Sequence, residues 1–215
     1  AVLASSSVAD THYVSTNGAN SAPFTDWTSA SWAIQPAVNA AAPGDTVLVT
    51  DGFYTVTSEI MLTNAVALLS VNGASCTTIY GGWPLTTNRC VSVGHTNAVL
   101  SGFTLANGHE QRTGGACVVV GTVRDCIIAS NVLHHSAGHG GGAYMMGSGR
   151  LQNCLVFSNK TDNAGGGIYF ENGGRAWNCV VQSNRSQNGG GVFFNAKGTM
   201  SNRTVRYNTA MCYGG

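Results

Sequence analysis

Short apolar segments with alternating side-chain directions recur through the second half of the chain. Between residues 153 and 157, Cys154 and Val156 fall on one face of an extended backbone, whereas Asn153, Leu155 and Phe157 fall on the other. An alternation of period two predicts a β-strand with one buried face. We expect the face with Cys154 and Val156 to point inward, because a small thiol packs as an apolar group.

These segments belong to an internal repeat. Each copy opens with a glycine run and an apolar stretch, and the runs start at Gly114, Gly140, Gly165 and Gly189. An apolar strand closed by asparagine follows in each copy, and a weaker copy, GFTLANG, comes before them. The closing asparagines are Asn107, Asn131, Asn159, Asn184 and Asn208, at steps of 24, 28, 25 and 24 residues. A period in the twenties without a helical pattern predicts an all-β solenoid, because each unit can bury its apolar face only against its neighbours.

Stacking of the repeats predicts two columns of identical residues. Cys126, Cys154 and Cys179 share one repeat position and should form an interior column of buried thiols. The closing asparagines should form a second column at a turn, where their side chains can hydrogen-bond nearby backbone. Of the other cysteines, Cys76 and Cys90 flank one turn and are the favoured pair if the chain contains a disulfide.

The N-terminal quarter has a different pattern. Residues 29–42 read as a short amphipathic helix that is ended by Pro43 and Gly44. A solenoid must cover its first coil, because an open sheet edge and a bare core would aggregate. We therefore assign residues 13–45 to an N-terminal cap that contains this helix.

The coils are assigned to residues 46–215. At Tyr213-Gly214-Gly215 the repeat predicts another glycine run that opens a further strand, so we expect the coils to continue beyond it. Residues 1–12 start with apolar and small side chains. This composition is typical either of the tail of a secretory signal that ends near Val8 and Ala9, or of a disordered N-terminus.

Composition narrows the function classes. The chain has 215 residues, of which 43% are hydrophobic and 9% are charged, against about 25% charged in an average domain. A chain with this share of hydrophobic residues can bury a core, and this composition excludes a disordered protein. A formal net charge of +1 offers no electrostatic basis for binding nucleic acid. No apolar run approaches the roughly 20 residues of a membrane-spanning helix.

The polar segments between each closing asparagine and the next glycine run must lie above one another on one side of the solenoid. They carry four of the six histidines and five of the nineteen charged residues, and the longest of them, residues 132–139, should project as a lip. In a chain this poor in charge, such a cluster is the best candidate site. Its members are His109, Glu110, Arg112, His134, His135, His139, Lys160, Asp162 and Arg185.

A second set of charges precedes the cysteine strands. Arg124, Arg150 and Arg175 should stack at the opposite turn. Stacked like charges repel unless they are paired or exposed, which favours a solvated edge that discourages lateral association. A groove for an anionic polymer is the alternative.

The chain resembles the right-handed parallel β-helix proteins of the pectate-lyase-like superfamily, which have the pectin lyase fold, and in particular uncharacterised secreted bacterial members. The motifs that carry the resemblance are YVSTNGAN from Tyr13, IQPAVNAAAPGDTVLVTDGFY from Ile34, SVNG from Ser70, VLSGFTLANG from Val99, and the glycine and asparagine repeats. The resemblance covers nearly the whole chain. It implies a single-stranded parallel β-helix that is secreted or displayed on the cell surface, and it is much less specific for activity.

The resemblance to the lyases of this superfamily implies binding, and cleavage by β-elimination, of an acidic polysaccharide. In these enzymes a base removes the proton α to a uronate carboxylate, and calcium or a second cation neutralises that carboxylate. Lys160 or Arg185 could serve as the base, with His134 or His135 as alternatives. Arg112 could neutralise the carboxylate.

Further residues of the cluster would bind the polymer, namely His109, Glu110, Arg112, His139, Asp162 and Gln187. A calcium ion would have only Glu110 and Asp162 as acidic ligands on this face, and no metal site can be assigned. The same two carboxylates, on coils two apart, are the only candidates for an inverting glycoside hydrolase. The alternative function is a non-catalytic adhesin or structural stalk that presents loops to a cell-surface glycan.

Overall fold

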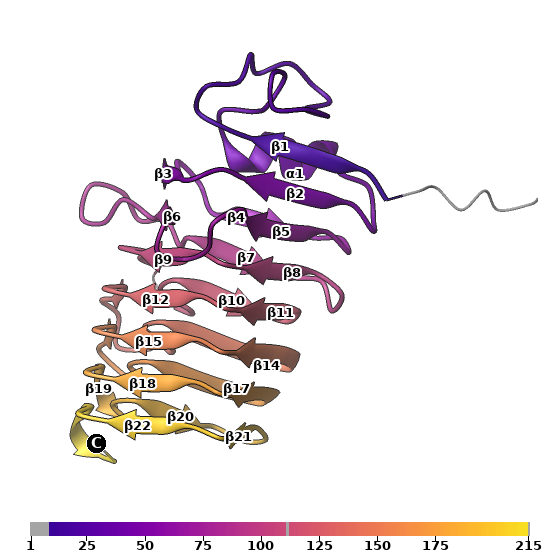
Figure 1. The fold of residues 1–215 in the computed structure, drawn as a ribbon. Helices are drawn as coiled ribbons and strands as arrows, with labels where there is room; N and C mark the ends of the chain where they lie inside the picture. The colour runs from indigo at the N-terminus through magenta and orange to yellow at the C-terminus, as the bar shows by residue number, and fades with distance from the viewer. Residues whose placement is uncertain (1–8, 111, 215) are drawn as a thin grey trace, which may run out of the picture.

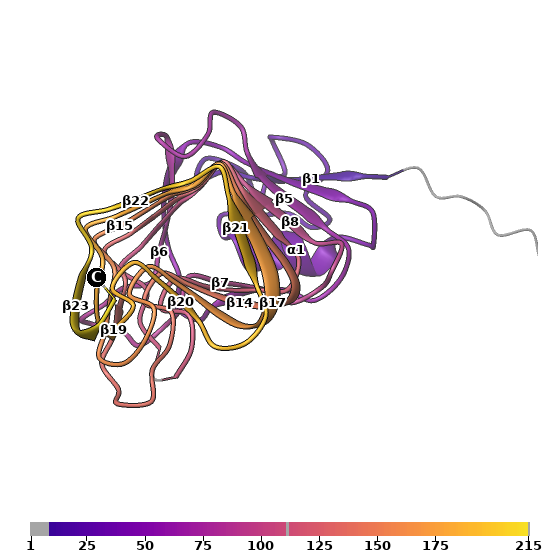
Figure 2. The same cartoon turned by 90° about the horizontal axis from the view of Figure 1, so that it is seen from below.

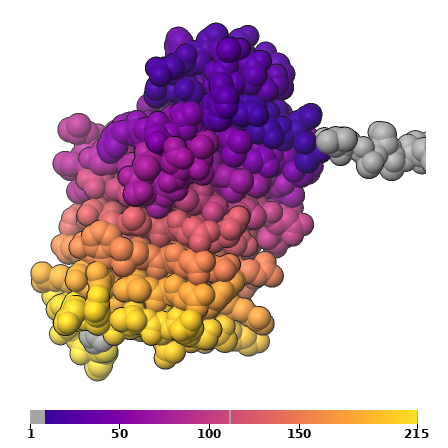
Figure 3. Space-filling view, viewed as in Figure 1, coloured from indigo at the N-terminus to yellow at the C-terminus, as the bar shows by residue number. Residues whose placement is uncertain are grey.

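The chain forms a parallel β-helix in a computed structural model that describes residues 9–110 and 112–214. Every pairing between the described strands is parallel, and the helix α1 (Ile34–Ala40) lies beside the first strands. Figure 1 shows the coils stacked along one axis with α1 near the N-terminal end, and Figure 3 shows the same order as successive bands of colour. The all-β solenoid with one short helix expected from the sequence is confirmed.

Three sheets form the walls of the solenoid, and Figure 2 shows them in cross-section. Sheet A bends into two halves. One half contains β4 (Ile60–Leu62), β7 (Val91–Val93), β10 (Cys117–Val119) and β20 (Val192–Phe194). The other contains β1 (Thr11–Val14), β2 (Thr46–Val49), β5 (Ala67–Ser70), β8 (Val99–Ser101), β11 (Thr122–Arg124) and β21 (Thr199–Ser201). The long strands β14 (Ala143–Gln152) and β17 (Ile168–Trp177) run through both halves.

Sheets B and C complete each coil. Sheet B consists of β3 (Gly52–Thr55), β6 (Thr77–Tyr80), β9 (Thr104–Ala106), β12 (Ile127–Ala129), β15 (Leu155–Phe157), β18 (Val180–Gln182) and β22 (Thr204–Arg206). Sheet C consists of β13 (Val132–Leu133), β16 (Lys160–Thr161), β19 (Arg185–Asn188) and β23 (Thr209–Tyr213). Sheet C is therefore built only by the coils that carry the asparagine and glycine repeat.

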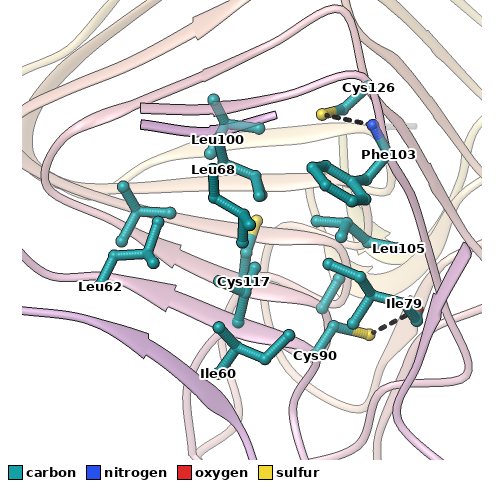
Figure 4. Close-up of a cluster of buried hydrophobic side chains, with 14 of the residues drawn as sticks. Ile60, Leu62, Leu68, Ile79, Cys90, Leu100, Phe103, Leu105, Cys117 and Cys126 are labelled. Carbon is teal, nitrogen blue, oxygen red and sulfur yellow. Dashed lines mark hydrogen bonds between the residues drawn. The ribbon is translucent and has the colours of Figure 1, made fainter. Parts of the chain in front are cut away.

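The interior is filled by the inward positions of the alternating strands. Figure 4 shows a section of this core, in which Leu68 and Leu100 from neighbouring strands of sheet A lie near Phe103. Each of these side chains is fully buried. Burial of such a side chain is worth roughly 1.5–3 kcal/mol, so the column of inward residues is the main stabilising feature of each coil.

The three repeat cysteines lie in one interior column, as the alternation predicts. Cys126, Cys154 and Cys179 are at most 2% exposed, and the Cys154 thiol donates to the carbonyl of Gln152 at 3.1 Å. Burial raises the pKa of the Cys154 thiol well above its ordinary value. These thiols therefore behave as small apolar side chains with one local hydrogen bond.

The suggested disulfide between Cys76 and Cys90 does not form. Cys76 is exposed, whereas Cys90 is buried and both are free. The Cys90 thiol donates to the carbonyl of Ile79 at 3.5 Å, and burial raises its pKa to about 12. The two residues flank one segment of the sequence, but Cys76 precedes β6 of sheet B, whereas Cys90 precedes β7 of sheet A.

Four of the closing asparagines form a hydrogen-bonded ladder. The side-chain oxygen of Asn159 accepts from the backbone amide of Asn131 at 3.1 Å and from its side-chain amide at 2.8 Å. Asn184 bonds Asn159 in the same way, and Asn208 bonds Asn184. Since Asn131, Asn159 and Asn184 are at most 1% exposed, these bonds satisfy amide groups that would otherwise be buried without partners.

Asn107 does not belong to this ladder, contrary to the sequence expectation. The pairing of β12 with β9 aligns Asn131 with Gly108, and the amide of Gly108 donates to the Asn131 oxygen at 2.7 Å. Asn107 instead takes the preceding turn position with a φ of 49°. It shares this left-handed conformation with Ser130, Ser158 and Ser183. Asparagine tolerates such a conformation, and therefore the residue type alone did not distinguish the two positions.

The glycine runs mark a corner at which neighbouring coils approach closely. A Cβ atom at Gly166 would lie 2.6 Å from the carbonyl oxygen of Arg185 and closer still to that of Gly190. Only glycine fits there. The runs therefore allow the chain to pass from sheet C into sheet A with the backbones of successive coils in contact.

The N-terminal boundaries differ from those expected. β1 begins at Thr11 and pairs with β2, so sheet A starts before residue 13, and the coil strands begin before residue 46. The proposed end of a secretory signal near Val8 and Ala9 falls at the first described residue, and both Val8 and Gly215 lie outside the described residues.

The helix is shorter than the predicted span of residues 29–42. It begins at Ile34, because Ser31 pairs with Tyr13 and Val14 beside β1 and the backbone of Ala33 is extended. Trp32 is consequently 58% exposed instead of facing the core. The helix contacts β1, β2 and β4 through Ile34, Ala37 and Val38.

Candidate functional site

The outer face of sheet C carries the charged side chains that the sequence groups together. Along its strands, Leu133, Thr161 and Ser186 point inward and are buried, so the alternating neighbours point to solvent. Lys160 and Arg185 lie in register on adjacent strands. Neighbouring strands are about 4.8 Å apart, so two cationic side chains emerge from this face one coil apart.

An aspartate links two of the predicted site residues. The Nδ1 atom of His134 lies 3.2 Å from one carboxylate oxygen of Asp162, and Nζ of Lys160 lies 3.8 Å from the other. All three side chains are about 40% exposed. Solvent screens such pairs, so their worth for stability is at most about 1 kcal/mol. The arrangement instead fixes the direction of the His134 ring and leaves its Nε2 atom free of the aspartate.

His109 adjoins this group from the preceding coil. Its ring stacks on Trp83 with centroids 4.0 Å apart, and His134 lies 5.7 Å from Trp83 and 6.2 Å from His109. His109 is 5% exposed, and neither ring nitrogen has a hydrogen-bond partner among the described residues. Burial, and then the neighbouring His134, lower the pKa of His109 below its ordinary value. Its ring is therefore neutral near pH 7. We call His109, His134, Lys160, Asp162 and Arg185 the histidine face.

Trp83 and Arg89 were not expected from the sequence. Trp83 lies in the excursion between β6 and β7, outside the repeat, and no spacing connects it to His109. Arg89 lies 3.2 Å from the carboxylates of both Glu59 and Glu110, and its side chain is 11% exposed. Its guanidinium also donates to the carbonyls of Thr113 and Gly114.

The carboxylate of Glu110 acts on the neighbouring His109 electrostatically and is engaged by its own loop and by Arg89. It accepts from the backbone amides of Arg112 and Thr113 at 2.7 and 2.8 Å, besides its ion pair with Arg89. It therefore orders the loop before the glycine run. Arg112 is exposed on this loop, and Gln187 is exposed on β19 beside Arg185.

The other two histidines of the predicted cluster, His135 and His139, lie apart from His109 and His134. His135 is exposed at the tip of the lip, where its Nδ1 atom accepts from the amide of Ala137 at 3.0 Å. His139 stacks on Tyr169, with centroids 4.4 Å apart, and joins an aromatic column on the outer side of sheet A with Tyr144 and Phe193. Burial lowers the pKa of His139. Sequence order placed these residues in the same loops, but the turn of the chain directs them to different faces.

The expected stack of three arginines contains only two of its members. Arg150 pairs with Arg175 across β14 and β17, but Thr122 occupies the equivalent place on β11. Arg124 aligns with Gln152 and forms an ion pair with Asp125 at 3.2 Å. The two-residue shift arises because β14 and β17 have longer corners than the coil before them.

The two carboxylates that a calcium ion could use on this face already have other partners. Glu110 is engaged by Arg89 and backbone amides, and Asp162 by His134 and Lys160. In the part of the chain that the structure describes, no three or more His, Cys, Asp or Glu side chains form a group that could hold a metal ion. The same engagement disfavours these two carboxylates as a hydrolytic pair.

No described helix is long and apolar enough to cross a membrane.

Comparison with known proteins adds one likeness. No family model and no curated protein matches the chain. Among solved structures, the pectin methylesterase from Aspergillus niger, in a penultimately deglycosylated form, aligns with 93% of this chain and 87% of that chain. The sequence identity is 13% and the TM-score is 0.46. No residue role is transferred at this level, and the fold class of the chain, a parallel β-helix, rests on its own strand pairing.

Proposed function

We propose that this protein binds an acidic polysaccharide across the histidine face, outside the cell or on its surface. The observation that carries the proposal is the register of Lys160 and Arg185, which places two cations on adjacent coils with a half-exposed His134 beside them. Among the described residues, the ion-pair partner of Lys160 is Asp162 at 3.8 Å, and Arg185 contacts the sulfur of Met211 and no carboxylate. Both can therefore donate charge-assisted hydrogen bonds to carboxylates of a polymer.

The geometry suggests how the same face would perform β-elimination. Asp162 would hold the Nδ1–H of His134, so that Nε2 accepts the proton α to a uronate carboxylate. Lys160 and Arg185 would neutralise that carboxylate while negative charge develops on it. The electron pair of the broken C–H bond forms the new double bond, and the glycosidic oxygen leaves and takes a proton from water. In this proposal His134, and not Lys160 or Arg185, is the base, because a neutral imidazole has a lone pair at Nε2, whereas a guanidinium and an ammonium group have only donors.

The test is a panel of pectic, alginate and glycosaminoglycan polymers, offered with and without calcium. Affinity electrophoresis would report binding, and the absorbance of unsaturated uronate would report elimination. We expect at least one polymer to retard the migration of the protein. The Lys160→Ala, Arg185→Ala double variant should lose this retardation. Arg206→Ala is the matched control, because Arg206 is an exposed cation on β22 that bonds Gln182.

The variant His134→Gln separates binding from chemistry. If the protein cleaves, this variant should keep its binding and lose unsaturated product by at least about a hundredfold, the usual worth of a general base. Absence of retardation by every polymer, with the protein shown to be folded, would contradict the proposal and favour the adhesive or structural stalk.

A further inference from the structure

A second group of cations lies at the corner of sheet A, on the side of the solenoid away from β19 and β23 (Figure 2). We call Arg150, Arg175 and Lys197 the cationic corner. Arg150 and Arg175 are in register on β14 and β17, and Lys197 comes from the turn between β20 and β21. The three side chains are exposed, and three successive coils each supply one of them.

The corner is hollowed. β14 and β17 bend at Gly147 and Gly173, which pair with each other and have positive φ angles, and the coil that follows turns between β20 and β21. Two adjoining hollows of about 430 and 470 Å³ lie at this corner. Both hollows are lined by Arg150, Arg175 and Thr199. Lys197 lines the first, and Trp177 and Ser201 line the second.

The cations of this corner are uncompensated. Within the described residues, the side chains of Arg150, Arg175 and Lys197 make no ion pair and no hydrogen bond. Glu171, the acidic residue of β17, accepts instead from Asn195 at 3.4 Å. The Glu171 carboxylate is also close to the hydroxyl of the buried Tyr169, and burial together with this carboxylate raises the pKa of Tyr169 to about 12. Two like charges directly opposite each other on neighbouring strands are destabilising, so the corner carries a cost that an anion would remove.

We propose that the cationic corner binds a sugar that carries a sulfate or phosphate monoester. Such a group has three terminal oxygens and can accept from two guanidinium groups and an ammonium or hydroxyl group together. A uronate carboxylate has only two oxygens and would leave part of the charge unmatched. Trp177 supplies the aromatic face on which a sugar ring can pack, and the hydroxyls of Thr199 and Ser201 lie within the same hollow.

This site is independent of the histidine face. Its residues belong to sheet A and to the turn between β20 and β21, whereas Lys160 and Arg185 belong to sheet C. Failure of either proposal therefore leaves the other unaffected, and the variants that test one do not alter the other.

The experiment is a calorimetric titration of the full chain with four probes: glucose 6-sulfate, glucose 6-phosphate, glucuronate and inorganic sulfate. We expect at least one of the two monoesters to bind at least about tenfold more tightly than glucuronate or inorganic sulfate. The tighter of the two identifies the ester. Arg175→Gln and Lys197→Gln should each weaken binding by about tenfold or more, the usual cost of losing a charged hydrogen bond. Arg206→Gln, which removes one cation elsewhere on the surface, should leave the affinity for the monoesters unchanged.

Thermal unfolding distinguishes a binding role from a structural one. Without ligand, Arg175→Gln should unfold at the same or a higher temperature, because it removes a stacked like charge. The monoester should raise the unfolding temperature of the wild type and not that of Arg175→Gln. Equal binding of all four probes, no binding of either monoester, or unchanged binding in both corner variants would overturn the proposal.

Discussion

A buried asparagine is both the most repeated and the most constrained residue of this protein. The side chain of Asn159 accepts two hydrogen bonds from the coil before it and donates two of its own, so that its buried polar atoms all have partners. The same residue type one position earlier, at Asn107, takes a left-handed turn and donates to the hydroxyl of Tyr80 and the carbonyl of Trp83, outside the ladder. At this scale the physical role of a residue follows from its hydrogen-bond partners and not from its type.

The ladder predicts a sharp difference between two asparagines. Asn159→Leu should lower the free energy of unfolding by about 2–5 kcal/mol, because the amide and carbonyl groups of Asn131, Ile128 and Asn184 lose their partners in the interior. Asn107→Gly should cost only about 1 kcal/mol, since glycine adopts the same φ and only two partly buried hydrogen bonds, to Tyr80 and Trp83, are lost. Denaturant unfolding measures both. Equal effects of the two substitutions would show that the ladder has no special weight.

At the scale of elements, the N-terminal end is joined by a single carboxylate. Asp45 is 6% exposed and accepts from the amides of Asp10 and Ala42 at 2.8 and 2.7 Å, and His12 lies 3.2 Å away. Burial acts to raise the pKa of Asp45, but these hydrogen bonds and His12 outweigh it and leave the pKa lowered. The end of α1, the start of β1 and the start of β2 are thereby fastened together.

Asp45 predicts an acid sensitivity confined to this end. An aspartate whose folded pKa lies below its unfolded value of about 3.9 contributes stability above that pH and loses it as the pH falls through the folded pKa. Below about pH 4, amide exchange in β1 should therefore accelerate before that in β12 or β15. Asp45→Asn should show fast exchange in β1 already at pH 7. Uniform exchange along the solenoid at low pH would contradict this assignment.

At the scale of the whole molecule, the solenoid is a one-dimensional stack in which each coil contacts only its neighbours. Val156 and Val181 are equivalent and fully buried. Deletion of residues 156–180 joins Leu155 to Val181 and should give a folded protein with one coil fewer and cooperative unfolding. Circular dichroism and thermal unfolding measure this.

The control is a deletion longer by one residue. Removal of residues 156–181 places Gln182 at the inward position of Val156, and a slip of one residue turns every following side chain of the strand to the other face. It should abolish cooperative unfolding. Equal behaviour of the two deletions would show that the register of the coils is not what holds the stack.

Local patterns determined the solenoid, its period and its thiol column, because period-two alternation and the repeat are written in neighbouring residues. The positions of Lys160, Arg185 and the ladder asparagines followed from the same repeat. Excursions outside the repeat were not predictable: Trp83 reaches His109, and Arg89 reaches Glu110, through contacts between coils.

Only the tertiary structure decided which of the clustered residues meet. Four histidines lie near one another along the chain. His109 and His134 lie on the histidine face, whereas His135 lies at a loop tip and His139 stacks in the aromatic column. The separation of Arg124 from Arg150 and Arg175 likewise depends on corner lengths. The physical reason is that alternation sets the direction of a side chain within a strand, whereas loops and bends obey no period, and their side chains are placed by packing against other coils.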